Sequence, residues 1–344
     1  MTNAFPAVMS KLLAHTALES EEVRGAFDAI LAGSWTPVQV AAFAVALRMN
    51  GESAETIVAA ARAMRERMTP VEHSFPIVVD TCGTGGDGAN TLNLSSGAAL
   101  VIAACDLRVA KHGNRSASSR CGSADVFEAM GIRIDVPPEL QSRVLTEAGI
   151  AFLFAQIHHP ALRHAGQARR ELGTRTIFNA LGPLVNPARA THQLIGVYDD
   201  SLRPLVARAL GLLGSKGAWV VRGDDGLDEV SPCAATRVSE LTPDGQVHER
   251  VVAPEHFGLK RSEPSDISGA GVDHNARVLE AIVSGEPHPA RDGVLLNAAA
   301  AMAVATGDEL PACAERARKA LDRGRVRDTF ERWRSATRRA LGAP

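Results

Sequence analysis

The chain has 344 residues, of which 45% are apolar and 22% charged, and its formal net charge is −2 at pH 7. This composition indicates a globular protein long enough for two domains, and it gives no basic field that would attract nucleic acid, so small metabolites are the expected ligands. The five cysteines lack metal-binding spacing, no run of about 18 apolar residues occurs, and no signal-peptide core follows the N-terminus, so we expect a cytoplasmic protein outside any membrane.

The first 70 residues are predicted to be helical. Helices are expected over residues 21–33, 37–50 and 54–68, each preceded by a capping serine or threonine. The run 37–50 is apolar around most of its circumference, which is more than a surface helix needs. It is therefore expected to pack between neighbouring helices or across a subunit contact, and the simplest alternative is a core helix.

After Pro76, short β-rich segments alternate with helical ones. The candidate strands are 77–82, 107–112, 132–136, 193–198 and 218–223, with helices expected at 95–106 and 123–131. This alternation indicates a mostly parallel sheet. The tail from Pro311 is expected to be helical and to cover one face of the sheet. The predicted fold is thus α/β, with a small all-helical domain and a larger α/β domain built on a mostly parallel central sheet.

A cluster of glycines follows the first predicted strand, in the segment DTCGTGGDGANTLNLSS (80–96). Gly83, Gly85 and Gly88 have the spacing of a dinucleotide-binding fingerprint, but the next strand ends in basic residues where that fingerprint requires a ribose-binding acid. The loop also carries its own carboxylate, Asp87, which would repel a bare pyrophosphate. Because clustered glycines let amide groups converge on an anion, we predict a phosphate loop that works with a metal ion. A tight strand-to-helix turn is the alternative.

Two further segments could bind anions at the same edge of the sheet. Asn93, Ser95 and Ser96 stand at the expected start of the next helix, where free amides and the helix dipole favour negative charge. The segment 111–123 (KHGNRSASSRCGS) combines cations with hydroxyl groups, which predicts an anion clamp, with a basic surface loop as the alternative. Both follow strands of one parallel sheet, so they should emerge at its carboxyl edge.

Two adjacent acids, Asp228 and Glu229, follow the predicted strand 218–223. Such a pair suits a hard divalent cation that also touches phosphate oxygens, and Mg²⁺ is the expected ion. A solvated acidic pair is the alternative. A cation there would supply the positive charge that Asp87 requires.

Four segments in this order resemble the anthranilate phosphoribosyltransferase family, and the similarity spans nearly the whole chain. They are GTGGDGANTLNLSS, VAKHGNRSASSRCGSADVFEAMG, RRELGTRTIFNALGPLVNP and GLDEVSP. The resemblance implies that anthranilate and 5-phosphoribosyl 1-pyrophosphate (PRPP) react to give N-(5-phosphoribosyl)anthranilate and pyrophosphate, the second step of tryptophan biosynthesis. It also implies a need for Mg²⁺, with two ions per site.

The same resemblance implies the domain organisation of a nucleoside phosphorylase-type phosphoribosyltransferase. Residues 1–72 would form the helical domain, and 165–188 would return to it as a hinge segment. Residues 73–164 and 189–344 would form the α/β domain that binds PRPP. A homodimer through the helical domain is expected.

The resemblance also assigns residues to ligands. The PRPP contacts it implies are Gly83, Thr84, Gly85, Gly86, Asp87, Asn93, Ser95, Ser96, Lys111, Ser118 and Ser119. The anthranilate contacts are Gly83, Asn114, Arg169 and Gly182, and the metal ligands are Ser95, Asp228 and Glu229. The alternative is a helix surface on which Arg169 and Arg170 are both solvated. Only one of the pair can face a pocket, and the motif rather than physics favours Arg169. Arg222 replaces a histidine common in relatives, which gives no reason to revise the activity.

The implied chemistry needs no strong base. Displacement at ribose C1 develops positive charge on the sugar and negative charge on pyrophosphate, which amides and metal ions stabilise. An aromatic amine is uncharged near neutral pH and attacks directly, so Arg169 would contribute mainly by positioning it. His112 is a candidate proton acceptor, and a structural histidine is the alternative. Cys82 and Cys121 are interpreted as small packing residues.

Two other functions stay open. A pyrimidine nucleoside phosphorylase-like enzyme would share the fold class and a lysine-bearing phosphate loop, but the complete GTGGD loop and the acidic pair disfavour it. A non-catalytic nucleic-acid-binding relative would need a basic groove, which the slightly negative net charge does not support.

Overall fold

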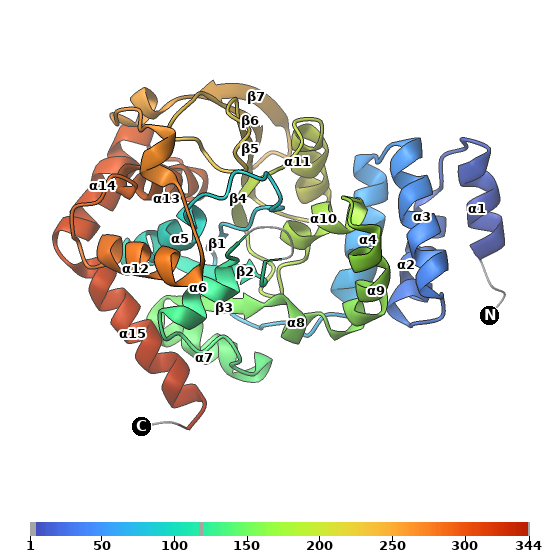
Figure 1. Cartoon of the computed structure of the whole chain (residues 1–344), viewed down its shortest axis with the longest axis horizontal. Coiled ribbons are helices and arrows are strands. Elements are labelled where there is room, and N and C mark those ends of the chain that lie inside the picture. Colours follow the sequence, from blue (N-terminus) through green and yellow to red (C-terminus); the bar gives the residue numbers. More distant parts are fainter. Residues whose placement is uncertain (1–4, 117–119, 343–344) are drawn as a thin grey trace.

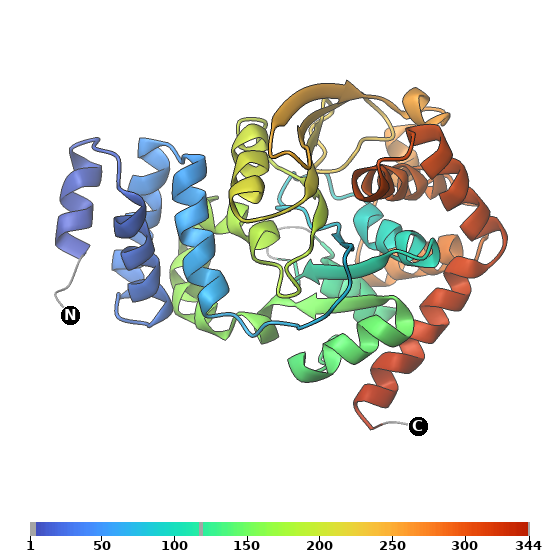
Figure 2. The same ribbon diagram turned by 180° about the vertical axis from the view of Figure 1, so that it is seen from behind.

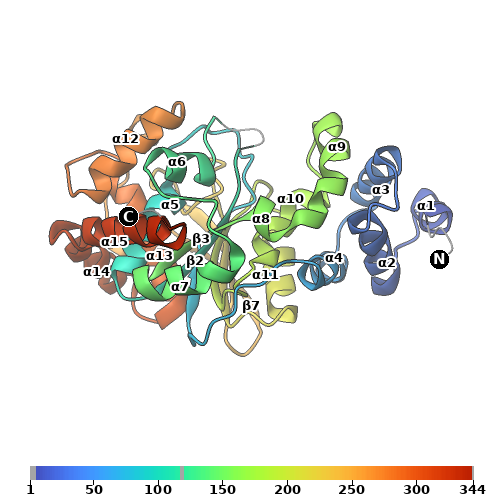
Figure 3. The same ribbon diagram turned by 90° about the horizontal axis from the view of Figure 1, so that it is seen from below.

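The computed structural model describes residues 5–116 and 120–342 and places a group of N-terminal helices beside a larger α/β body (Figure 1). These helices are α1 (Phe5–Leu13), α2 (Ser20–Leu31), α3 (Pro37–Asn50) and α4 (Ala54–Glu66). Figures 2 and 3 show α1 at the outer end of the group, farthest from the α/β body. The three predicted helices are confirmed, and α1 is an additional one.

Side-chain caps fix where these helices begin. Thr36 Oγ1 accepts a hydrogen bond from Gln39 N at 3.3 Å, and Gln39 Oε1 accepts one from Thr36 N at 3.0 Å. Ser53 Oγ accepts from an amide in the first turn of α4 at 3.1 Å. For α2 the expected cap, Ser20, is the first helical residue, and Glu19 takes the cap position.

Two later helices, α9 (Arg163–Leu172) and α10 (Ile177–Leu181), pack against the N-terminal group. α9 contacts α3 and α2, while α10 contacts α4 and α3. Phe178 of α10 lies with its ring centroid 5.5 Å from that of Phe27 in α2. We call α1–α4 together with α9 and α10 the helical bundle.

A seven-stranded sheet with the order β3-β2-β1-β4-β5-β6-β7 forms the centre of the α/β body. Its strands are β1 (Val78–Asp80), β2 (Arg108–Gly113), β3 (Ile150–Phe154), β4 (His192–Gly196), β5 (Gly217–Gly223), β6 (Thr236–Leu241) and β7 (Val247–Val252). Strands β1 to β5 pair in parallel, and β6 and β7 add an antiparallel edge. The predicted mostly parallel sheet is confirmed.

One strand prediction is wrong. Residues 132–136 are not a strand, and the third strand of the sheet is β3 instead. Ile132, Ile134 and Val136 are buried while the residues between them are exposed, so the alternating pattern is real. This extended segment lies beside the C-terminal helix, where the amide of residue 133 donates to Thr337 Oγ1 at 3.4 Å. The alternation of buried and exposed residues in this segment therefore comes from side-chain packing, and the segment is not hydrogen-bonded into the sheet.

Helices cover both faces of the sheet. The remaining α-helices are α5 (Leu94–Ala104), α6 (Ser123–Ala129), α7 (Pro138–Ala148), α8 (Ala155–His158), α11 (Leu202–Leu212), α12 (Val272–Val283), α13 (Arg291–Thr306), α14 (Leu310–Asp322) and α15 (Arg325–Ala340). Short 3₁₀ segments are Pro160–Leu162, Gly182–Val185, Pro254–Phe257 and Pro264–Ile267. α13 packs on β4 and β5, and α11 packs on β5 and β6. The C-terminal tail is helical as predicted, and it packs against α5, α7 and α13.

The apolar interior forms two clusters on opposite faces of the sheet. Trp219 and Val221 of β5 belong to the larger cluster around α5 and α13, and Val220 between them belongs to the second. The second cluster continues from α11 into the helical bundle, so apolar packing connects the bundle to the sheet. Among the described residues, none of the helices combines the length and apolar character needed to cross a bilayer.

Candidate functional site

The candidate site lies at the carboxyl edge of the parallel strands. β1 and β4 are neighbours in the sheet, and the chain runs from β1 to β2 on one side and from β4 to β5 on the other, so the strand order reverses between them. Such a switch point opens a crevice where open α/β sheets bind ligands. The glycine loop (residues 81–93) follows β1, and the acidic loop (residues 224–232) follows β5.

The glycine loop crosses the end of β4. Gly85 and Gly86 have φ angles of +65° and +82°, a left-handed conformation that side chains disfavour. Thr84 N donates to Gly196 O at 2.9 Å, and Tyr198 N donates to Thr84 Oγ1 at 3.1 Å. The loop is thus anchored at its start, while its glycines present backbone at the crevice.

Two other glycines let the acidic loop approach the glycine loop. A Cβ on Gly196 would lie 1.5 Å from the backbone oxygen of Asp228, and one on Gly83 would lie 3.2 Å from Asp228 Oδ2. Asp228 N also donates to Asp87 Oδ2 at 3.4 Å. The meeting of the two loops is therefore built into the backbone packing.

Where these loops meet, the charges of Asp87, Asp228 and Glu229 affect one another. Burial, followed by the negative charges of Asp87 and Glu229, raises the pKa of Asp228 well above its ordinary value. Burial also raises the pKa of Glu229 to about 7, while the charge of Lys111 opposes the shift. The site therefore concentrates desolvated negative charge that a bound cation would relieve.

The N-terminus of α5 lies beside the acidic pair. Ser95 N donates to Glu229 Oε1 at 3.1 Å, so one amide expected to meet an anion instead meets a carboxylate of the protein. Ser96 is buried, and its Oγ has no hydrogen-bond partner among the described residues.

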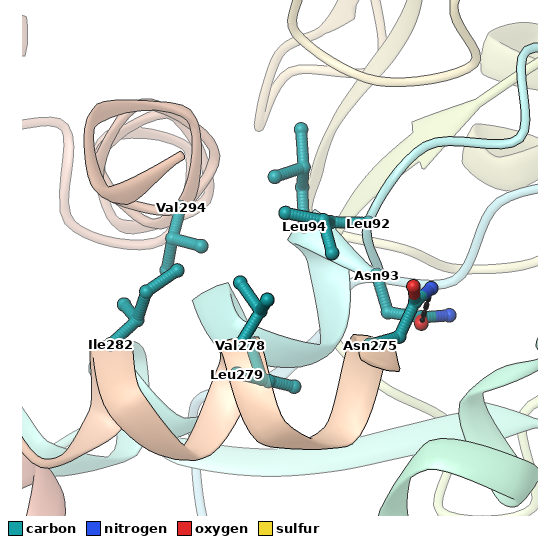
Figure 4. A pocket seen from close by; sticks show the side chains of 8 residues that line it. All are labelled: Leu92, Asn93, Leu94, Asn275, Val278, Leu279, Ile282 and Val294. Carbon is teal, nitrogen blue, oxygen red and sulfur yellow. Dashed lines mark hydrogen bonds between the residues drawn. The ribbon is translucent and has the colours of Figure 1, made fainter. Parts of the chain in front are cut away.

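Asn93 is held from two sides. Its Nδ2 donates to Cys121 O at 3.2 Å, and its Oδ1 accepts from Asn275 Nδ2 of α12 at 3.0 Å. Figure 4 shows the two amides facing each other beside a narrow pocket, which is otherwise lined by Leu92, Leu94, Val278, Leu279, Ile282 and Val294. Sequence reasoning missed Asn275, which is remote in the chain and carries no local signal.

Lys111 is 2% exposed and lies beneath the glycine loop. Its Nζ donates to Thr81 O at 2.7 Å and to Thr81 Oγ1 at 3.2 Å. The cation thus supports the loop from below and lies near enough to Glu229 to lower the pKa of that acid.

Asp80, at the end of β1, is a buried acid that sequence reasoning did not single out. It accepts from His112 N at 3.1 Å and from Asn186 Nδ2 at 2.7 Å, and burial raises its pKa to about 6. An acid inside an otherwise apolar strand was the available signal. It ties β1, β2 and the segment after α10 together beneath the site.

His112 is buried beside Gly182. Its Nδ1 lies 3.0 Å from Gly182 O, which requires a proton on Nδ1, and its Nε2 has no partner among the described residues. The His159 ring lies 5.1 Å away. Burial, reinforced by His159, lowers the pKa of His112 well below its ordinary value, so the ring is neutral with an available Nε2 lone pair.

The loop after β2, predicted to bind an anion, holds Arg115 against α6. Arg115 pairs with Asp125 at 2.9 Å and with Glu128 at 2.8 Å, so its charge is committed to α6. Asn114 Oδ1 accepts from the amide of Arg115 at 2.8 Å. Ser118 and Ser119 lie outside the described residues.

The structure separates the adjacent arginines of α9. Arg169 is half-buried with its guanidinium carbon 5.7 Å from the Phe178 ring centroid, and burial lowers its pKa. Arg170 is exposed. A third arginine, Arg175, was missed: its guanidinium stacks on Tyr198, 4.4 Å from the ring centroid, next to the glycine loop.

The remaining residues singled out in the sequence have structural roles. Arg222 Nη1 donates to Val197 O at 3.0 Å. Burial raises the pKa of Cys82 and raises that of Cys121 to about 11, so both thiols stay protonated and are poor nucleophiles.

No three His, Cys, Asp or Glu side chains among residues 5–116 and 120–342 are grouped to hold a metal ion on their own. Mg²⁺ usually binds through one or two carboxylates together with substrate phosphates and water. Asp228 and Glu229 with the neighbouring hydroxyl of Ser95 are hard oxygen donors of that kind. The crowding of desolvated carboxylates at this point fits a site completed by a cation and a phosphate ligand.

Two family models match the chain. One, described as a glycosyl transferase family a/b domain, matches residues 76–327, and the other, a helical bundle domain of the same family, matches residues 6–68. Similar curated proteins are named anthranilate phosphoribosyltransferase. The one from Symbiobacterium thermophilum is 50% identical over 323 residues, covering 94% of each chain. The one from Moorella thermoacetica is 48% identical over 319 residues, covering 92% of this chain and 94% of the relative.

Solved structures give the same result. The anthranilate phosphoribosyltransferase of Thermus thermophilus superimposes with a TM-score of 0.90 at 40% identity, covering 96% of this chain and 99% of that one. The Saccharomyces cerevisiae protein of the same name, in complex with PRPP and Mg, has a TM-score of 0.91 at 28% identity and covers 98% of each chain.

Proposed function

Because the chain belongs to the anthranilate phosphoribosyltransferase family, we propose that it converts anthranilate and PRPP to N-(5-phosphoribosyl)anthranilate and pyrophosphate, the second step of tryptophan biosynthesis. Family membership confirms the resemblance found in the four sequence segments, and with it the phosphoribosyltransferase class of enzyme. The observation that carries the proposal is the close approach of the glycine loop and the acidic loop across Gly196. That approach joins a phosphate-binding backbone to a pair of metal-binding carboxylates.

PRPP is proposed to bind along the carboxyl edge of β1 and β2. The glycine loop, from Gly83 through Thr84, Gly85 and Gly86 to Asp87, would surround the pyrophosphate, with Lys111 below. Asn93, Ser95 and Ser96 would complete the site at the start of α5, together with Ser118 and Ser119. Two observations support this PRPP site. The glycines of the loop have a left-handed backbone, and the Ser96 hydroxyl at the start of α5 has no hydrogen-bond partner among the described residues.

Mg²⁺ is proposed as the cofactor, with two ions per site. Asp228, Glu229 and Ser95 would hold it. When bound, Mg²⁺ would neutralise the negative charge that grows on the departing pyrophosphate. The raised pKa values of both acids support this assignment, because burial makes their ionised forms costly and a bound cation would stabilise those forms.

Anthranilate is proposed to bind between the helical bundle and the end of β2. Arg169 would bind its carboxylate, because its half-buried guanidinium makes no ion pair with any described residue. Gly83, Asn114 and Gly182 would line the rest of the pocket. A planar fork of donors orients a carboxylate, and so aims the neighbouring amine at ribose C1.

His112 is proposed to accept the proton that the amine loses after attack. A weak base is sufficient, because an anilinium-like nitrogen is strongly acidic, and Nε2 carries the free lone pair of the neutral ring. His112→Phe should lower kcat several-fold with little change in either KM, and an unchanged kcat would leave the residue a structural role.

A homodimer through the helical bundle is proposed from its exposed apolar side chains. Leu13 at the end of α1 is 73% exposed, and Val38 and Met49 of α3 are 78% and 74% exposed. Val38 and Met49 are about three helical turns apart and therefore lie on one side of α3. α1, which ends at Leu13, packs against α3. Light scattering should detect a dimer for the wild type and a monomer for Val38→Asp with Met49→Asp.

A cytoplasmic location is proposed because all five cysteines are free.

The test of the function is the fluorescence of anthranilate in the presence of the chain, PRPP and MgCl₂. Fluorescence should fall only when PRPP and Mg²⁺ are both present, with release of one pyrophosphate per anthranilate. Phosphate-dependent cleavage of a pyrimidine nucleoside, with anthranilate untouched, would favour the phosphorylase alternative. Salt-sensitive retention on DNA or RNA without PRPP affinity would favour a nucleic-acid binder.

A further inference from the structure

Arg175 approaches the glycine loop from the side of the helical bundle. It lies in the turn between α9 and α10, and a Cβ built on Gly86 would sit 3.2 Å from its Nε and 3.5 Å from its Nη2. Its guanidinium carbon lies 4.4 Å from the ring centroid of Tyr198, the residue whose amide donates to Thr84. The guanidinium therefore borders the backbone that is expected to surround a phosphate.

The Arg175 guanidinium has no anionic partner among residues 5–116 and 120–342. Arg175 is half-buried, yet it makes no hydrogen bond or ion pair with any residue in the described part of the chain. Arg115, also next to the site, shows the contrasting case, because it is committed to Asp125 and Glu128. A guanidinium carries five N–H donors that cannot be deprotonated in a protein, so a partly desolvated one requires acceptors from a ligand or water.

Tyr198 fixes the orientation of Arg175. The tyrosine is 5% exposed, its amide is bonded to the glycine loop, and its hydroxyl accepts from Arg48 Nη1 of α3 at 3.4 Å. Its ring is thereby held at both ends. Stacking on that ring restrains the plane of the guanidinium and leaves the donor edge available.

We propose that Arg175 binds the pyrophosphate group of PRPP and stays bound to it during departure. This assignment rests on the proposed function. In the reaction the C1–O bond breaks with its electron pair passing to pyrophosphate, a C1–N bond forms to the amine, and the amine then loses a proton. Negative charge thus grows on the oxygens nearest the guanidinium, and the contact strengthens in the transition state.

The position of Arg175 favours pyrophosphate over the anthranilate carboxylate. Arg175 borders Gly86, in the same loop whose Asp87 touches Asp228 of the proposed metal site. Arg169 stacks on Phe178 within the helical bundle and is the candidate for the carboxylate. Arg175 is therefore assigned to the departing pyrophosphate, and Arg169 to the incoming anthranilate.

The test is titration calorimetry of the full chain with inorganic pyrophosphate and MgCl₂, combined with steady-state kinetics. Arg175→Gln should raise the Kd for pyrophosphate about 10- to 100-fold, as expected for lost hydrogen bonds between charged groups. Arg175→Lys should recover part of that affinity, because it keeps the charge without the planar fork. Arg170→Gln, which removes an exposed arginine nearby, should bind pyrophosphate like the wild type.

Steady-state kinetics distinguishes binding of Arg175 to the pyrophosphate of PRPP from binding to the anthranilate carboxylate. Arg175→Gln should raise KM for PRPP and lower kcat while KM for anthranilate stays constant. A pyrophosphate Kd within twofold of the wild-type value would overturn the assignment, and so would an increase confined to the anthranilate KM. If the wild type bound pyrophosphate through Arg175 but consumed no anthranilate, the proposed function would fail while this anion site stood.

Discussion

Asn297 of α13 binds Val230 on both of its backbone polar groups. Asn297 Oδ1 accepts from Val230 N at 2.9 Å, and Asn297 Nδ2 donates to Val230 O at 3.0 Å. The asparagine is fully buried, and Val230 directly follows Glu229. A side chain in the interior thus fixes the backbone of the acidic loop.

Replacing this asparagine should affect the metal requirement as well as stability. Asn297→Ala would leave two buried backbone groups unpaired and cost about 2–4 kcal/mol of unfolding free energy. The acidic pair would also lose its fixed position, so the Mg²⁺ concentration for half-maximal activity should rise several-fold. Gln141→Ala is the matched control, because Gln141 Nε2 donates to two buried carbonyls, of Val136 and Phe152. If both variants lose stability but keep the wild-type Mg²⁺ requirement, Asn297 has no positioning role.

Gly196 should tolerate no side chain. A Cβ there would overlap the backbone of Asp228, with only 1.5 Å to its oxygen, so β4 or the acidic loop would have to move. Gly196→Ala is expected to lower kcat/KM for PRPP at least about 100-fold, as misplacement of a catalytic group by about 1 Å does. Gly25→Ala in α2 meets no atom within 4 Å and should be neutral or slightly stabilising. Comparable activity of the two variants would contradict this packing.

Replacing Arg169 should change the KM for anthranilate and leave the KM for PRPP nearly constant. Arg169→Ala removes the proposed partner of the anthranilate carboxylate and should raise KM for anthranilate about 10- to 100-fold, leaving KM for PRPP within twofold. Arg170→Ala, at the exposed neighbouring position, is the control and should leave both constants unchanged. Initial rates with each substrate varied in turn measure both. A rise in KM for PRPP alone would remove Arg169 from the acceptor pocket.

Acid should destabilise the fold through buried histidines. Burial lowers the pKa of His159 from 6.5 to about 4, and the pKa values of His112 and His158 shift in the same direction. Between pH 6.5 and 4 the unfolded chain therefore binds a proton on His159 that the folded chain excludes, so the stability contributed by neutral His159 is constant above this window and falls as pH drops through it. His159 alone should cost about 2 kcal/mol between about pH 7.5 and pH 5. Urea unfolding at both pH values should show a smaller pH dependence for His159→Gln, and an identical dependence would contradict the shift.

Local sequence signals predicted the elements that depend on neighbouring residues. The caps at Thr36 and Ser53 placed two helices correctly, because capping involves residues within one turn. The segment 132–136 has the alternation of a strand but packs beside α15, whereas β3 is apolar throughout and shows no alternation. The spacing of apolar residues alone cannot distinguish a strand from an extended segment outside the sheet. The difference is whether the segment has a neighbouring strand to which its backbone can hydrogen-bond.

The candidate site shows the same division. Glycines and acids in contiguous motifs could be identified before the structure, because the chemistry of a loop is visible in its own residues. The groups that position them could not: Asn275, Asn186 and Asn297 are 182, 106 and 67 residues away from the residues they bind. Arg175 lies inside a recognised motif, but only the fold shows that it borders Gly86.

The measurement that tests the account most directly is PRPP binding by titration calorimetry with and without MgCl₂, for the wild type and for Asp228→Asn combined with Glu229→Gln. These substitutions preserve side-chain size while removing both carboxylates from the loop that meets the glycine loop. We predict that Mg²⁺ tightens PRPP binding at least about tenfold in the wild type and has no effect in the double variant. Equal enhancement by Mg²⁺ in both proteins would contradict the proposed metal site and the joining of the two loops around PRPP.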